Sequence, residues 1–174
     1  MTELGYENRG LHSYYRTRSL DLPIPDYWLP EGFTIRSVDI MEDFIHYRNV
    51  QASVFKHLKG MTRRMADIYR TACFYNSEID LVTVTPDGTF STFCTVRLDP
   101  VSRIAEFEPV GTHPDYRKLG LAIAVLLEGL KRLEKHSPTL LCIQGATPTE
   151  AANRLYESKG LTEKTPVHEW YKKL

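Results

Sequence analysis

The order of apolar and polar residues along the chain predicts a mixed α/β domain. Short alternating or wholly apolar runs indicate strands, whereas apolar residues at every third or fourth position indicate helices. We expect strands at residues 33–37, 79–85, 89–98, 103–112 and 140–145, and a final strand pair at 161–163 and 167–172 around Pro166. We expect helices after Asp39, over 62–75, after Gly120 and over 147–159. This order favours a mixed sheet flanked by helices over a helical bundle or a barrel.

Two local patterns are stronger than the rest. Pro86-Asp87-Gly88 separates two expected strands and is typical of a tight reversal, so residues 79–98 are expected to form a hairpin. Farther along, large apolar residues recur in steps of four and three: Leu119, Ile123, Leu126, Leu130 and Leu133. This stripe predicts an amphipathic helix that packs on the sheet.

The start of the chain is similar to its end. Residues 5–16 parallel residues 160–172, each running from a glycine to a histidine followed by aromatic and basic residues. We interpret residues 1–20 as an arm resembling the last strand pair of a preceding copy of the domain. Residues 21–32 are then a stiff proline-rich linker, and residues 33–174 are the domain itself. The alternative is a chance likeness between two tyrosine-rich segments.

Composition and charge exclude several classes of protein. The 174 residues carry 22 lysines and arginines against 22 aspartates and glutamates, a balance that argues against binding to nucleic acid or an anionic membrane. No stretch approaches the roughly 20 apolar residues that cross a bilayer, and residues 1–10 are polar, so we expect a cytoplasmic protein. The widely spaced Cys73, Cys94 and Cys142 fit reduced core thiols, and without a metal-binding motif we expect no metal.

The most informative segment joins the strand at 103–112 to the helix that follows. Its turn, Arg117-Lys118-Leu119-Gly120-Leu121-Ala122, contains small residues that let a ligand approach the main chain. The first N–H groups of a helix lack partners and carry partial positive charge. The turn is therefore expected to hold an anion such as a phosphate.

Two motifs resemble those of the GCN5-related N-acetyltransferase (GNAT) family. Arg117-x-x-Gly120-x-Ala122 resembles the family's motif A, and Ala152-x-x-Leu155-Tyr156-x-x-x-Gly160-Leu161 resembles motif B. They occur in the family's order, one helix and one strand apart, and the match covers about residues 33–174. The resemblance implies a mixed, mostly antiparallel sheet splayed between its fourth and fifth strands. It also implies acetyl-CoA as co-substrate and direct transfer of the acetyl group to a primary amine.

The resemblance further assigns the cofactor contacts. The pyrophosphate of coenzyme A is implied to lie on the N–H groups of the turn, and the pantetheine arm along the end of the preceding strand. The implied cofactor-binding residues are Val110, Gly111, Thr112, Arg117, Lys118, Leu119, Gly120, Leu121, Ala122, Thr149 and Tyr156. Thr149 departs from the asparagine common in the family: it can cap the helix and donate a hydrogen bond, but it offers no amide. Pro109 cannot donate to a neighbouring strand, so we expect a bulge there that splays the sheet.

Two carboxylates are candidates for the catalytic base. Glu106 and Glu108 lie two positions apart on one expected strand and therefore project to the same face. A primary amine has a pKa of about 10, so a base that removes its proton accelerates the reaction. Glu106 falls where histone-type family members have their base, whereas Glu108 is closer to Pro109, and we favour Glu108. Alternatively, one or both carboxylates pair with a nearby cation or bind the substrate's amine.

Tyr156 matches the tyrosine that the family places near the sulfur, where its phenol can donate a proton to the departing thiolate. The alternative is a packed aromatic side chain on the helix face. His113 is expected to satisfy backbone groups in the turn before Pro114. His46 and His57, on or near the first helix, are weaker candidates for acceptor binding.

The acceptor is expected to be a small-molecule amine, because the balanced charge offers no surface for nucleic acid and no acidic tract for a basic protein tail. Two alternatives remain: a module that binds coenzyme A without turnover, and a protein N-acetyltransferase acting on a lysine or an amino terminus. Unpaired strand edges at the amino-terminal arm also suggest self-association as a homodimer.

Overall fold

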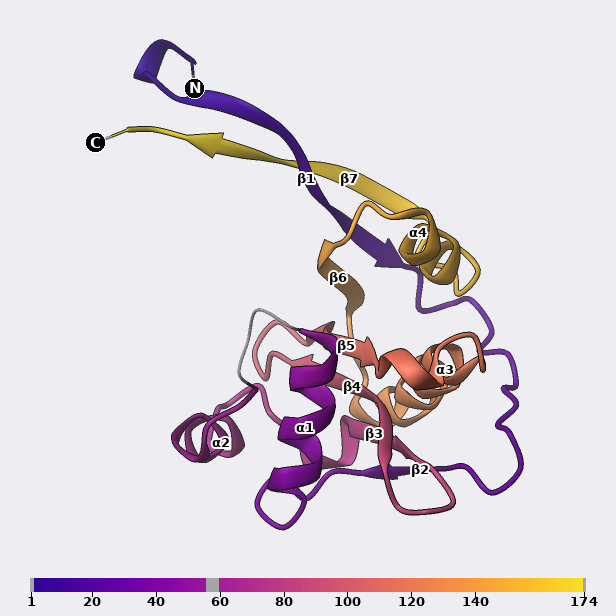
Figure 1. Cartoon of the computed structure of the whole chain (residues 1–174). Helices are drawn as coiled ribbons and strands as arrows, with labels where there is room; N and C mark the ends of the chain where they lie inside the picture. Colours follow the sequence, from indigo (N-terminus) through magenta and orange to yellow (C-terminus); the bar gives the residue numbers. More distant parts are fainter. Residues whose placement is uncertain (1, 56–59, 174) are drawn as a thin grey trace.

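The computed structural model describes residues 2–55 and 60–173 and contains one seven-stranded sheet in the order β2-β3-β4-β5-β6-β1-β7 (Figure 1). The strands are β1 (Glu7–Arg18), β2 (Thr34–Ser37), β3 (Asp80–Val84), β4 (Phe90–Leu98), β5 (Ile104–Thr112), β6 (Leu140–Ala146) and β7 (Glu163–Tyr171). The α-helices in the described residues are α1 (Phe44–Val54), α2 (Arg63–Arg70), α3 (Leu121–Leu133) and α4 (Glu150–Glu157). Every neighbouring strand pair is antiparallel except β5–β6. The expected mixed, mostly antiparallel α/β sheet is therefore confirmed.

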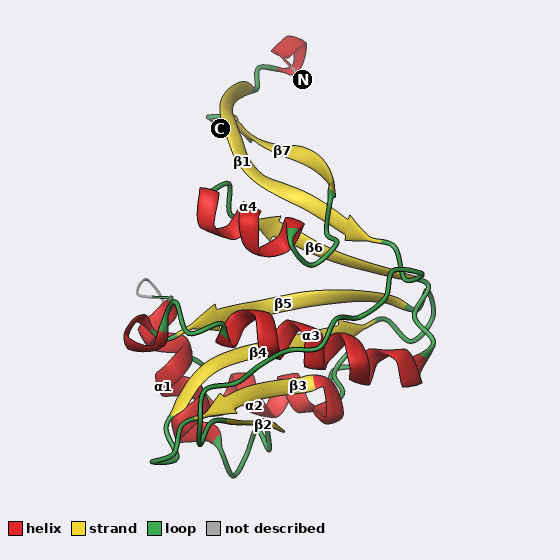
Figure 2. Cartoon of the chain, turned by 90° about the vertical axis from the view of Figure 1, so that its right-hand side faces the viewer, coloured by secondary structure: helices red, strands yellow, loops and turns green. Residues whose placement is uncertain are grey.

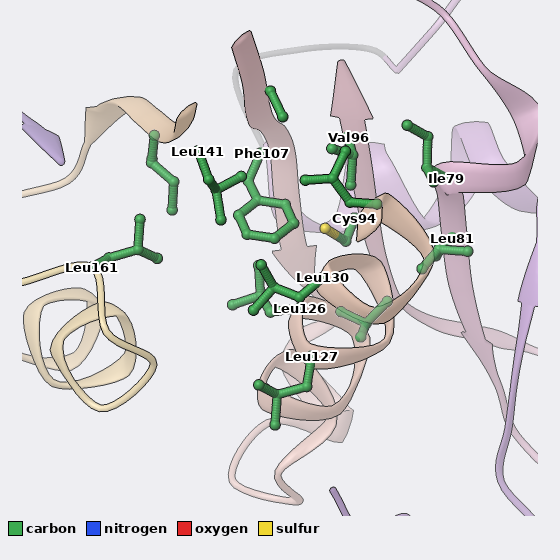
Figure 3. Close-up of a cluster of buried hydrophobic side chains, with 14 of the residues drawn as sticks. Ile79, Leu81, Cys94, Val96, Phe107, Leu126, Leu127, Leu130, Leu141 and Leu161 are labelled. Carbon is green, nitrogen blue, oxygen red and sulfur yellow. The ribbon is translucent and has the colours of Figure 1, made fainter. Parts of the chain in front are cut away.

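Two apolar clusters cover the two faces of the sheet. One joins Val96 and Phe107 of the strands to α3, including Leu126 and Leu130, and extends to Leu161 after α4 (Figure 3). Leu126, Leu130 and Leu133 of the predicted stripe are buried, whereas Leu119 lies in the turn and is half exposed. The second cluster packs α1 and α2 on the other face: Val38, Ile40, Phe44, Tyr47, Val50, Ala66, Val82, Phe90 and Phe93. The sheet is thus a layer between α1 and α2 on one side and α3 and α4 on the other.

The amino-terminal arm forms one strand in the interior of the sheet. β1 lies between β6 and β7 and is antiparallel to both (Figure 2). The expected strand pairs are wrong at both ends of the chain, because the arm contributes the single strand β1 and the final segment the single strand β7. Pro166 lies within β7, opposite Tyr14, rather than in a turn. An edge strand tolerates a proline because its outer side needs no donor.

Two buried arginines of β1 donate hydrogen bonds to α4 and to the segment that follows it. The fully buried Arg16 donates from Nη1 to the carbonyl oxygen of Leu161 at 2.8 Å and from Nη2 to Oε1 of Glu157 at 3.2 Å. Arg18 donates from Nε to the carbonyl oxygen of Lys159 at 3.1 Å. Both acceptor carbonyls belong to the segment that follows α4, so the two guanidinium groups hold this segment against β1.

Residues 21–32 form a strap that crosses α3 (Figure 2). Tyr27 packs against the first apolar cluster, and its hydroxyl donates to Oε2 of Glu128 at 2.9 Å. Lys131 of α3 donates to Asp26 at 3.0 Å. The proline-rich segment is therefore held against the domain by contacts along α3.

Three smaller points complete the fold. α2 ends at Arg70, five residues before the expected end at Tyr75. All three cysteines are free thiols, but Cys73 is exposed, so only Cys94 and Cys142 are core thiols as expected. Within residues 2–55 and 60–173, no helix has the length and apolar character needed to cross a membrane.

Candidate active site

The sheet opens between β5 and β6. The two strands pair where residues 104–106 lie beside residues 140–142, and beyond this point β5 has β4 as its only strand neighbour among residues 2–55 and 60–173 (Figure 2). One edge of β5 over residues 107–112 therefore has no strand partner. Its main-chain groups on that side are available to a ligand.

A bulge on β5 lies at this opening. Cys94 pairs with Val110 and Val96 pairs with Phe107, so β5 has one more residue than β4 across this interval. The extra residue falls at Glu108 and Pro109, which are joined by a cis peptide bond. The bulge expected from Pro109 is confirmed.

The turn before α3 presents free backbone donors. Lys118 and Gly120 adopt left-handed conformations, with φ of 65° and 77°, and Gly120 caps α3 without a side-chain hydrogen bond. The first bond of the helix runs from the N–H of Ala124 to the carbonyl of Gly120 at 3.0 Å, so the N–H groups of Leu121 and Ala122 precede it without helical partners. A Cβ atom at Gly120 would meet nothing within 4 Å, so the space in front of these donors is open.

A cleft of about 500 Å³, here called the turn cleft, lies in front of this turn and extends to α4. Six of the implied cofactor residues line it: Thr112, Arg117, Lys118, Gly120, Leu121 and Ala122. Six other lining residues, from α1, the turn, α3 and α4, were not assigned to the cofactor from the sequence: Val54, Tyr116, Ile123, Ala151, Ala152 and Leu155. Ala152 and Leu155 belong to the segment that resembles motif B, whereas for the other four at most the helical periodicity of their elements indicated where they would lie.

The remaining implied cofactor residues lie around this cleft. Val110 packs against the first apolar cluster, and Leu119 is half exposed in the turn. Gly111 allows close packing, because a Cβ atom there would lie 2.7 Å from side-chain carbons of Phe93 and Val54. Thr149 caps α4, its Oγ1 accepting from the N–H of Ala152 at 3.3 Å, and His113 similarly accepts from the N–H of Asp115. The expected role of His113 in the turn is confirmed.

A second cavity, here called the aromatic pocket, lies on the α1–α2 side of the β5 bulge. It encloses about 480 Å³, and the described part of its wall contains Tyr47, Gln51, Phe55, Gly60, Met61, Met65, Tyr69, Arg97, Glu108 and Pro109. His46 is exposed beside Phe90 and is absent from this wall, and His57 lies outside the described residues. Because Glu108 and Thr112 lie on the same strand, β5 connects the aromatic pocket to the turn cleft.

The two candidate bases have different surroundings. Glu106 forms an ion pair with Arg97 at 4.0 Å, from Oε2 to Nη1, and does not line the aromatic pocket. Glu108 lines the pocket and makes no hydrogen bond or ion pair with any described residue. Burial raises the pKa of Glu108, the nearby Arg97 charge opposes this shift, and Glu106 adds to it. Glu108 is thus the carboxylate with unused hydrogen-bonding capacity.

Tyr156 projects from α4 and packs against the first apolar cluster. Burial raises its pKa to about 12, with smaller contributions from Cys94 and from Glu108. Its hydroxyl makes no hydrogen bond within the described part of the chain. The phenol therefore stays protonated at neutral pH and is available as a donor.

A buried carboxylate behind the aromatic pocket was not predicted. Asp80 accepts hydrogen bonds from the hydroxyls of Tyr47 at 3.0 Å, Thr95 at 2.7 Å and Tyr75 at 3.1 Å. Burial raises the pKa of Asp80 to about 6, and the three hydroxyl donors oppose this shift. A single aspartate at the start of a strand forms no sequence motif, so only the three-dimensional structure reveals this cluster.

No protein-family model matches the chain. Among curated proteins, the mycothiol acetyltransferase of Paenarthrobacter aurescens is 25% identical over 152 residues, which span 83% of this chain and 47% of that protein. A GCN5-related N-acetyltransferase from Sphaerobacter thermophilus superposes with a TM-score of 0.75 at 21% identity, over 98% of this chain and 52% of that one. This chain thus spans about half the length of both proteins. The aminoglycoside 6'-N-acetyltransferase of Acinetobacter baumannii superposes with a TM-score of 0.61 at 13% identity, over 82% of this chain and 99% of that one.

Proposed function

This chain has the fold of the GCN5-related N-acetyltransferases, and we propose that it transfers the acetyl group of acetyl-CoA directly to a primary amine. The observation that carries the proposal is the position of the β5 bulge. On one side of it lies the turn cleft with its free N–H donors, and on the other lies the aromatic pocket with its unpaired carboxylate. An acetyl donor and an amine can thus approach each other at one point of the sheet.

The chemistry of the turn cleft fits coenzyme A. The N–H groups of Leu121 and Ala122 would hold the pyrophosphate, with Arg117 and Lys118 at the rim adding positive charge. The free edge of β5 would hold the amide groups of the pantetheine arm, as an added strand does. When bound, acetyl-CoA supplies the activated thioester.

The proton transfers are assigned to two side chains. Glu108 accepts a proton from the incoming ammonium, directly or through a water molecule, because its carboxylate is otherwise unpaired. Glu106, paired with Arg97, is the second candidate. Tyr156 donates a hydrogen bond to the sulfur as negative charge develops there; its raised pKa makes complete proton transfer less favourable than for an ordinary phenol.

We favour a small molecule as the acceptor. Two of the similar proteins bear names that refer to small molecules, a mycothiol acetyltransferase and an aminoglycoside acetyltransferase. The chain aligns with 47% of the mycothiol acetyltransferase, and this agrees with the hypothesis that residues 33–174 correspond to one copy of a tandem protein. The amino-terminal arm does not have the unpaired edges that were expected, because β1 pairs with β6 and β7. A homodimer would instead form through the edge strand β7, and a monomer mass that is independent of concentration would contradict it.

The cofactor part is tested by calorimetric titration with acetyl-CoA. Gly120→Glu places a bulky anion in front of the turn donors and is expected to weaken binding by at least tenfold. Gly88→Glu is a matched control, because Gly88 also has a left-handed φ, 86°, and no atom within 4 Å of a Cβ, but lies in the β3–β4 hairpin. Absence of binding to the native chain, or equal binding by Gly120→Glu, contradicts the proposal.

The catalytic part is tested by measuring thiol release from acetyl-CoA. Glu108→Gln is expected to lower kcat roughly a hundredfold while leaving acetyl-CoA binding intact. Glu106→Gln in parallel identifies the base, because the larger loss marks the carboxylate that removes the proton. If Glu108→Gln, Glu106→Gln and Tyr156→Phe all retain full turnover, the assignment of catalytic residues is wrong.

A further inference from the structure

The aromatic pocket has a wall that indicates which amines it can accept. Its described surface is dominated by aromatic rings and thioethers, contributed by Phe55, Met61, Met65 and the rings of Tyr47 and Tyr69. Such a surface binds apolar groups through area removed from water, and it desolvates any polar group that enters.

Several polar atoms in this wall already have partners, although the Nη groups of Arg97 make no hydrogen bond with a described residue. The Tyr47 hydroxyl bonds to Asp80 and Thr95, and the Tyr69 hydroxyl accepts from Nε of Arg97 at 3.1 Å. The side chains of Glu108 and Gln51 make no hydrogen bond with a described residue. Together they can accept hydrogen bonds from one ammonium group, but they offer few partners to a ligand with several hydroxyls.

The charges of the wall, together with that of Glu106 outside it, favour a single cation. Arg97 interacts with two carboxylates: it pairs with Glu106 at 4.0 Å, and its charge also acts on Glu108, which lines the pocket. Its guanidinium carbon lies 5.8 Å from the ring centre of Tyr69 and 5.5 Å from that of Phe74, so stacking holds the group against these rings. With both glutamates ionised, the three groups sum to one negative charge. One ammonium compensates this charge, whereas an anion at Arg97 would meet both carboxylates.

The two kinds of group come from different elements. Glu108 is on the β5 bulge, whereas Met65 lies in the first turn of α2 and Met61 in the segment before it. An acceptor would therefore place its amine at β5 and its body between α1 and α2. A volume of about 480 Å³ lies in the lower half of the range of small-molecule pockets.

Building on the proposed function, we infer that the acceptor is a compact primary monoamine whose amine is attached to an apolar or aromatic body, as in an arylalkylamine. Polyhydroxylated amines would leave hydroxyl groups unpaired in the wall. Polyamines would bury a second ammonium without a carboxylate among the described residues of the pocket.

The test compares kcat/KM for 2-phenylethylamine and hexylamine with the values for glucosamine, spermidine and a short lysine-containing peptide, by thiol release from acetyl-CoA. We expect the two apolar amines to exceed the others by at least tenfold. A preference for glucosamine, spermidine or the peptide overturns the inference. Tight acetyl-CoA binding without acetylation of either apolar amine also overturns it but leaves the cofactor proposal standing, whereas absence of acetyl-CoA binding contradicts the proposed function itself.

A matched pair of variants on α2 tests whether the aromatic pocket determines the preference for apolar amines. Met65 and Ile68 are both exposed, at 53% and 61%, but only Met65 lines the aromatic pocket. Met65→Gln is expected to raise KM for 2-phenylethylamine three- to tenfold with little change in kcat, and Ile68→Gln to leave both unchanged. An unchanged KM in Met65→Gln, or an equal rise in Ile68→Gln, contradicts binding of the amine's body at this wall.

Discussion

The sheet is stabilised in different ways on the two sides of the β5–β6 contact. In the body half, strands β2 to β5 are covered by helices on both faces, and Phe93 and Phe107 are 0% and 1% exposed. In the arm half, comprising β6, β1 and β7, every residue of β7 except Trp170 is exposed. Here the buried groups that join strand to helix include the side chains of Arg16 and Arg18. The body half thus depends on periodic apolar positions, whereas the arm half depends strongly on directed hydrogen bonds.

The candidate active site lies where these two halves meet. They are joined through three paired positions on β5 and β6, and the turn cleft receives residues from α1 in the body half and from α4 in the arm half. A change that loosens the arm half should therefore affect cofactor binding as well as stability. The following predictions test this difference between the halves.

The largest effect is expected from Arg16→Ala. It removes the donor to the buried carbonyl of Leu161 and leaves a cavity, so the free energy of unfolding should fall by about 3 kcal/mol. Arg9→Ala, which removes only the contact of an exposed arginine with the Tyr171 ring at 3.8 Å, should lower it by about 0.5–1 kcal/mol. Urea denaturation measures both, and equal effects would mean that the buried contacts of Arg16 do not hold the arm half.

A somewhat smaller effect, dependent on pH, is expected in the body half from Asp80. Its pKa is about 6 in the folded chain against an ordinary value of 3.8. Between these values the folded state keeps a proton that the unfolded state has lost, so this group's contribution to stability falls as pH rises through this interval. Over the whole interval the change amounts to about 3 kcal/mol, of which about 1.4 kcal/mol falls between pH 5 and pH 7.5.

Asp80→Asn removes this dependence. The difference in unfolding free energy between the native chain and the variant, measured at pH 5 and pH 7.5, should shift in favour of the variant at the higher pH. A difference that stays constant, or shifts towards the native chain, would show that folding does not raise the pKa of Asp80 into this interval.

A smaller effect is expected where the body half packs against the turn cleft. Gly111→Ala places a methyl group 2.7 Å from carbons of Phe93 and Val54, so α1 or the Phe93 ring must move, at a cost of about 1–2 kcal/mol. Because Val54 lines the turn cleft, acetyl-CoA affinity should fall as well. Thermal unfolding and titration of the same variant measure the two effects, and unchanged values of both would contradict the tight packing.

The smallest effect is expected from the strap. Tyr27→Phe removes the hydrogen bond to Glu128 but keeps the ring on α3, and should cost about 0.5–1 kcal/mol. Hydrogen exchange in residues 21–32 should increase while exchange in β4 stays unchanged. Faster exchange in β4 would mean that the strap and the body half open together.

The difference between the halves also explains what could be predicted from the sequence. The β3–β4 hairpin, the strand that became β5 and the helix after the turn were predicted because turn residues and apolar spacing determine them locally. Local signals of this kind also predicted the bulge at Pro109 and the unpaired N–H donors of the helix that begins after Gly120. In the arm half, Pro166 was interpreted as a break because a proline in a strand usually is one, and no local pattern shows that β7 is an edge.

The contacts that were missed join residues far apart in the chain. Arg16 donates a hydrogen bond to Leu161, 145 residues away, and Asp80 accepts hydrogen bonds from hydroxyls of α1, β4 and the segment after α2. Single-sequence patterns carry no information on such pairs. Glu108 could be proposed as a base from its neighbour Pro109, but the aromatic and thioether wall around it became visible only when α1 and α2 were placed.

The position of β1 between β6 and β7 has a consequence for the order of folding. During synthesis β1 leaves the ribosome before the other described strands of this sheet, yet its two partners are the last of these strands to be made. The body half contains mostly contacts between successive elements and can assemble while the rest of the chain is still being made. β1 must meanwhile remain unpaired, so closure of the arm half is a late, long-range step in the biogenesis of this protein.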